Sequence, residues 1–174
     1  SNATLAPGGS ATVVDGFTLK TSSGTDAISA VTVTLAAGTY AGISLVEITD
    51  SAGSIIYGSA SNPTSDSFSI SLSPSISASA TSVQYKIRIT PKSHAVMPSP
   101  PGASYAVTIR VTDWTGTNAK DGTDSGSATV TIDNSSPSNV TNATSTPGAT
   151  QVTVSWTNPT DIDFSAVLAI RNTS

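Results

Sequence analysis

The chain has 174 residues, a formal net charge of −4 and a pI near 4.5, and only 10% of its residues are charged. Its 7 lysines and arginines are scattered, so no basic surface is expected and nucleic acid is excluded as a partner. No segment approaches the roughly 18 consecutive apolar residues of a membrane span, so no membrane insertion is expected. Cysteine is absent, so disulfides cannot stabilise the fold.

Alternation of apolar and polar residues predicts an all-β protein. Serine and threonine interleave with valine, isoleucine and alanine, and helix formers are scarce, Glu47 and Met97 being the only glutamate and methionine. Eight strands are expected before residue 133, bounded by Gly, Pro, Asn and Asp turns. The first expected strand ends at Leu19. The other seven run through 31–35, 46–49, 55–57, 67–72, 83–90, 105–113 and 127–132.

The phase of the alternation predicts which side chains point inward. One core is expected to contain Val31, Val33, Tyr85, Ile87, Tyr105, Val107 and Ile109. Val83 and Ile89 are expected inward as well. In the hairpin 45–57, Val46 and Ile48 should point one way, and Glu47 and Thr49 the other.

The segment 90–102, TPKSHAVMPSPPG, is expected to be a loop, because its prolines lack the N–H groups that a sheet requires. Tyr105 opens the next strand just after this segment. Its position resembles the tyrosine corner of immunoglobulin-like sandwiches, in which the phenol bonds to an upstream backbone carbonyl.

The motifs YAVTIRVTD and VEITDSAG resemble immunoglobulin-like domains of bacterial surface proteins. The resemblance implies an immunoglobulin-like antiparallel β-sandwich over residues 11–133, with stability coming from apolar burial between two sheets. Residues 1–10 are expected to be a leader outside the fold. Ser1, Asn2 and Ala3 resemble the remnant of a cleaved affinity tag.

The polar segment 133–140, DNSSPSNV, is expected to link two modules. After it, QVTVSWTNP and DIDFSAVLAIR resemble the second and third strands of a fibronectin type III repeat, with Trp156 in its core. The resemblance implies that residues 134–174 are a linker and the first strands of an incomplete repeat. Residues 151–171 are therefore expected to pair with a second copy or with the flank of the first module.

No catalytic residue is expected. His94, the only histidine, lies in the proline-rich loop, and the chain has no second His or Cys to share a metal and no G-x-S-x-G motif. The chain is thus predicted not to be an enzyme, and no cofactor other than calcium is expected.

Two kinds of ligand site are candidates. Asp113, Asp121, Asp124 and Asp133 could supply oxygens to calcium at a module junction, as could Asp161 and Asp163 in the next module; alternatively, these are ordinary turn residues. Trp114 follows a strand directly and could stack on a sugar, or it could pack under a loop.

The resemblance and the Ser/Thr-rich composition imply a structural or spacer module of a multi-domain bacterial protein that is exported or on the cell surface. Its partners would be neighbouring domains of the same polypeptide. Two alternatives remain open: an adhesive or carbohydrate-binding module that uses the loops around Trp114 and Asp121, and an accessory domain of a larger secreted enzyme.

Overall fold

The computed structural model describes residues 3–98, 104–126 and 128–170. Its regular structure is almost entirely β. The described residues contain eleven strands and two short 3-10 turns, η1 (Thr39–Gly42) and η2 (His94–Val96). The predicted all-β class, with little or no helix, is confirmed.

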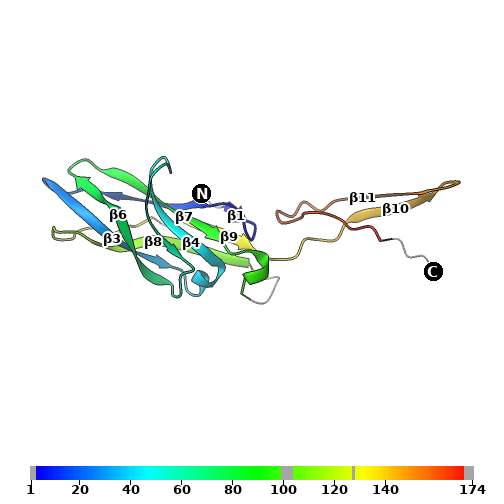
Figure 1. Cartoon of the computed structure of the whole chain (residues 1–174), viewed down its shortest axis with the longest axis horizontal. Coiled ribbons are helices and arrows are strands. Elements are labelled where there is room, and N and C mark those ends of the chain that lie inside the picture. Colours follow the sequence, from blue (N-terminus) through cyan, green and yellow to red (C-terminus); the bar gives the residue numbers. More distant parts are fainter. Residues whose placement is uncertain (1–2, 99–103, 127, 171–174) are drawn as a thin grey trace.

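Nine strands build two sheets that face each other as a sandwich (Figure 1). The five-stranded sheet has the order β1 (Ala3–Leu5), β9 (Ala128–Asp133), β8 (Ser104–Thr115), β3 (Thr25–Leu35) and β6 (Ser67–Ser79). The four-stranded sheet has the order β2 (Thr12–Leu19), β7 (Val83–Pro91), β4 (Ile43–Asp50) and β5 (Ile56–Ser61). All neighbours within these sheets are antiparallel except β1 and β9, which are parallel.

The eight predicted strands correspond to β2 through β9. The strand that sequence reasoning missed is β1, which lies in the segment 1–10 that was expected to be a leader outside the fold. Ala3 to Leu5 pair with Val130 to Ile132. Three residues are too few to show an alternation, which is why the sequence did not reveal this strand.

The space between the sheets is filled by apolar side chains. The fully buried ones are Val31, Val33, Val46, Ile48, Ile87, Ile89, Val107, Ile109, Val130 and Ile132, together with Ile43. The predicted core is confirmed, although Tyr105 is half-buried and packs against the core. The intervening Thr32, Lys86 and Arg110 are more exposed, as the predicted register requires.

One expectation about side-chain direction is wrong, and one residue pair is more buried than expected. Val83 begins β7 and is 41% exposed, because it lies at the end of the sheet beyond the packed core. Glu47 and Thr49 are buried along with Val46 and Ile48, although alternation assigns the two pairs to opposite faces; β4 is an inner strand, flanked by β7 and β5. Glu47 is neutralised there by Arg88, whose Nη2 lies 3.0 Å from Oε2.

The corner before β8 contains the hydrogen bond that the sequence predicted. The Tyr105 hydroxyl donates to the backbone oxygen of Pro98 at 3.1 Å. Residues 90–102 were predicted to be a loop, and this is confirmed only in part. Thr90 and Pro91 still belong to β7, and η2 follows two residues later. Residues 99–102 lie outside the described part of the chain.

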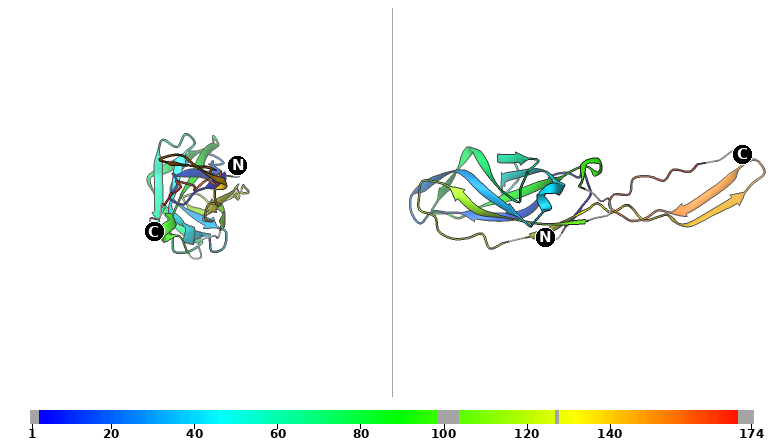
Figure 2. Two further views of the ribbon diagram at one scale, coloured as in Figure 1. Left: turned by 90° about the vertical axis from the view of Figure 1, so that its right-hand side faces the viewer. Right: turned by 90° about the horizontal axis from the view of Figure 1, so that it is seen from below.

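The last two strands form a separate sheet. β10 (Thr141–Pro147) and β11 (Val152–Thr157) pair antiparallel, and Figures 1 and 2 show this hairpin standing away from the sandwich along the long axis. The predicted pairing of this region with the flank of the first module is therefore not formed among the described residues. Pairing with a second copy stays a prediction.

Two further expectations for this region are wrong. The described residues of DIDFSAVLAIR contain no strand. Trp156 is 38% exposed, and its indole N–H donates to Asn158 Oδ1 at 2.8 Å. Both results have one cause, because no second sheet covers the hairpin in the described part of the chain and nothing is available to bury a core face.

Candidate functional site

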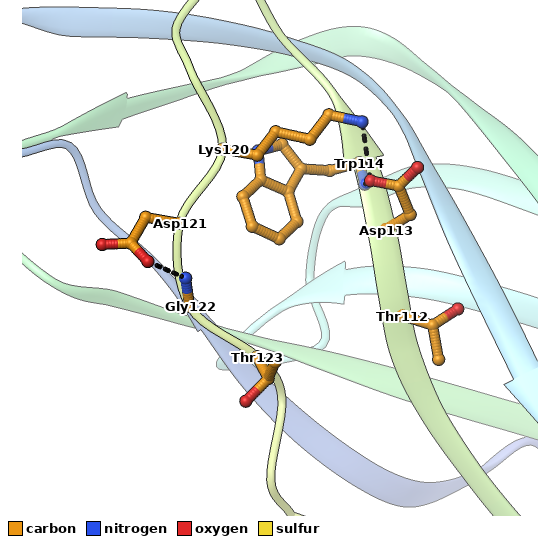
Figure 3. Close-up of a pocket in the computed structure, with 7 residues that line it drawn as sticks. All are labelled: Thr112, Asp113, Trp114, Lys120, Asp121, Gly122 and Thr123. Atoms are coloured by element: carbon orange, nitrogen blue, oxygen red, sulfur yellow. Dashed lines mark hydrogen bonds and ion pairs between the residues drawn. The ribbon is translucent and has the colours of Figure 1, made fainter.

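A hollow of about 480 Å³ lies between the end of β8 and the loop that follows it (Figure 3). It is lined by Thr112, Asp113, Trp114, Lys120, Asp121, Gly122 and Thr123. The hollow thus brings together three residues that the sequence singled out, namely Trp114, Asp113 and Asp121.

Trp114 provides the apolar wall of the hollow. Its side chain is half-buried and packs against the core, and in Figure 3 the indole lies between β8 and the facing loop. Trp114 therefore packs against the core, as one of the two interpretations expected, and it also lines the hollow. Stacking on a sugar stays a prediction.

Asp113 holds the polar side of the hollow together. Its Oδ1 lies 2.6 Å from Lys120 Nζ and accepts a hydrogen bond from the Trp114 backbone N–H at 2.8 Å. The hydrogen bond from Lys120 is the main reason why the pKa of Asp113 is lowered. The hollow thus combines an indole side chain with charged and hydroxyl groups.

The four aspartates predicted to share calcium do not form one cluster. Asp121, Asp124 and Asp133 each accept a hydrogen bond from a nearby backbone N–H, and only Asp113 and Asp121 line the hollow together. Among the described residues, no group of three or more His, Cys, Asp or Glu side chains is arranged to hold a metal ion. Calcium binding by these four residues stays a prediction.

The aspartates of the second region behave differently from each other. Asp161 accepts hydrogen bonds from the Ser138 backbone N–H at 3.2 Å and hydroxyl at 3.4 Å, which ties its segment to the linker. Asp163 lines a second hollow of about 580 Å³ and has a buried oxygen, Oδ1, without a hydrogen-bond partner. Asp161 is thus held by Ser138, whereas Asp163 lines the second hollow, so the two aspartates do not share a hydrogen-bond partner.

Sequence reasoning missed Asp15, although a signal was present. Asp15 is in phase with the buried Phe17 and Leu19, so alternation alone would have placed it inward. The register of β2 against β7 shifts between Val13 and Asp15, and this bulge buries the consecutive residues Val14 and Asp15.

The carboxylate of Asp15 is in an unfavourable environment. The side chain is 8% exposed, and Oδ2 has no hydrogen-bond partner. Burial raises the pKa of Asp15 to about 6; a hydrogen bond from Gly16 opposes the shift, and the charge of Asp124 adds to it.

Asp26 is the second buried aspartate that was missed, and its environment is favourable. It accepts hydrogen bonds from the Thr117 hydroxyl at 2.7 Å, the Thr117 backbone N–H at 2.8 Å and the Asn118 backbone N–H at 3.2 Å. These bonds, led by that of the hydroxyl, lower the pKa of Asp26. The side chain therefore fastens the start of the loop after β8 onto β3.

His94 lies in η2 and is exposed, as a solvated loop residue would be.

No helix in the described ranges has the length and apolar character needed to cross a membrane. Comparisons with protein-family models, with curated proteins and with solved structures find no match for this chain.

Proposed function

We propose that the chain is a non-catalytic structural module of a multi-domain bacterial protein, exported or on the cell surface, that separates neighbouring domains. Its sandwich would be immunoglobulin-like, and its hairpin would belong to a fibronectin type III-like unit. The Tyr105 to Pro98 hydrogen bond supports the first likeness, and the Val152 to Trp156 alternation supports the second.

The observation that carries this proposal is the linear arrangement of a filled sandwich and a following hairpin. The sandwich interior is packed with apolar side chains, and the linker after β9 leads to a β10–β11 sheet displaced along the long axis (Figure 1). The hairpin exposes Val152, Val154 and Trp156, which further strands could cover. A series of such units gives length, which is what a spacer supplies.

The proposal can be tested by measuring the distance between the two ends. Because the chain contains no cysteine, Ser82→Cys and Ala149→Cys introduce two unique sites for spin labels. These positions lie in the exposed turns before β7 and between β10 and β11. Pulsed electron resonance should give one narrow, long distance. A broad distribution that extends to short distances would contradict a spacer role.

The hollow at Trp114 favours a second candidate function, the binding of a carbohydrate. With Trp156→Phe, Trp114 remains as the only tryptophan, so its fluorescence reports on the hollow alone. Titration with a panel of bacterial and host cell-surface polysaccharides should then give saturable changes, and Asp121→Ala should weaken them. Unchanged fluorescence across the panel would contradict carbohydrate binding at this hollow.

A further inference from the structure

Three oxygen atoms lie near Gly126, in the loop after β8. A methyl group built on Gly126 would lie 3.5 Å from Asp124 Oδ1, 3.6 Å from Asp15 Oδ1 and 4.0 Å from the backbone oxygen of Gly16. Gly126 has no side chain, so the space among these oxygens is left free.

Two carboxylates lie beside this space, and neither forms an ion pair in the described part of the chain. Asp124 has hydrogen bonds from the backbone N–H groups of Val111 and Gly126. Asp15 is 8% exposed, and its other carboxylate oxygen, Oδ2, has no hydrogen-bond partner, so its negative charge is costly unless a positive ligand accompanies it.

We propose that Asp15, Asp124 and the Gly16 carbonyl bind a divalent cation of the calcium type. All three donors are oxygens, which hard cations prefer, and calcium accepts an irregular set of 6 to 8 oxygens completed by water. Gly126 is exposed and Asp124 is half-buried, so water can reach the remaining coordination positions.

This site differs from the one that the sequence predicted, since it uses Asp124 but takes its second carboxylate from β2. The cation would join strands of different sheets, because β2 belongs to the four-stranded sheet and the loop follows β8 of the five-stranded sheet. It would therefore hold the loop against the sandwich. The site is independent of the proposed spacer function.

The test measures the melting temperature of the full chain at pH 7.5, with calcium chloride and with excess chelator. Sites in extracellular modules have Kd values of roughly 10⁻⁴ to 10⁻³ M, so 10 mM calcium should raise the melting temperature by about 5–10 °C. Calorimetric titration with calcium chloride should show one saturable event.

Four variants locate the site. Asp15→Asn and Asp124→Asn remove a ligand charge, and Gly126→Ala puts a methyl group among the oxygens at ordinary contact distances. All three should lose the calcium response. Asp113→Asn is the matched control, because Asp113 is an exposed aspartate of the same region that is paired with Lys120, and it should keep the response.

Asp15→Asn should melt in chelator at least as high as the unmodified chain, because it removes a buried charge, so a lost calcium response would not reflect misfolding. If the unmodified chain shows neither a calorimetric signal nor a melting shift, the proposal is wrong. It is also wrong if Asp113→Asn abolishes the response while Asp15→Asn retains it.

Discussion

Gly58 in β5 lies where the open edges of the two sheets meet. A Cβ atom at this position would press against the backbone oxygen of Ser71 and lie 2.9 Å from Ile70 Cγ2 and 3.2 Å from Leu72 Cδ2, all in β6. Gly58→Ala must therefore push β5 away from β6, because a backbone oxygen cannot rotate aside as a side chain can. Overpacking of this kind costs about 1–3 kcal/mol.

For a sandwich of roughly 130 residues, that cost corresponds to a fall in melting temperature of about 4–10 °C. Thermal unfolding followed by circular dichroism measures it directly. The control is Gly16→Ala in β2, where the nearest atom to an added Cβ is Gln84 Nε2 at 3.3 Å, the mobile end of a side chain.

Glycine within a strand is less stable than alanine by roughly 0.5–1 kcal/mol, so Gly16→Ala should leave the melting temperature unchanged or raise it slightly. The two substitutions are chemically identical and both lie in strands, so their difference isolates the close approach of β5 to β6. Equal melting temperatures for the two variants would refute the reasoning.

Three other predictions concern stability. Ile109→Ala should lower the free energy of unfolding in urea by about 2–5 kcal/mol, because the side chain is fully buried; a loss below about 1 kcal/mol would contradict its place in the core. Tyr105→Phe should cost about 0.5–1.5 kcal/mol in the same assay through the lost bond to Pro98, and an unchanged midpoint would show that this bond is not stabilising. The pKa of Asp26 is lowered from 3.8, chiefly by Thr117, so its stabilisation is complete above pH 3.8 and is lost as the pH falls through the lowered value. Asp26→Asn should therefore lessen the fall in melting temperature below about pH 4. If the melting temperature of the variant falls as steeply with decreasing pH as that of the unmodified chain, other groups cause the fall.

The sandwich was largely predictable because alternation reports directly on a strand with one buried face. Alternation identified residues 31–35 of β3, and it identified β7 and β8. It did not identify the first half of β3, whose pairing with β6 shifts register between Ile28 and Ala30. It failed for β1, which is too short to alternate, and it did not reveal that Glu47 and Thr49 are buried. Glu47 pairs with Arg88 of another strand, a contact between residues far apart in the sequence.

The candidate sites were harder to predict, because they depend on which loops meet. The neighbours Asp113, Trp114 and Asp121 were found by their closeness in sequence, and they do share a hollow. Asp15 lies more than a hundred residues from Asp124, and only the packing of β2 near the loop after β8 brings them together. The spacing of residues along the chain does not predict that two such distant side chains lie close together.

The parallel pairing of β1 with β9 determines how the sandwich would respond to mechanical tension. A force along the chain pulls β1 toward its start and β9 toward its end, and because the two strands run in the same direction, they are drawn past each other along their length. The hydrogen bonds that link Ala3–Leu5 to Val130–Ile132 are then sheared together. An antiparallel terminal pair would instead open one bond at a time, so this geometry resists extension although only a few residues pair.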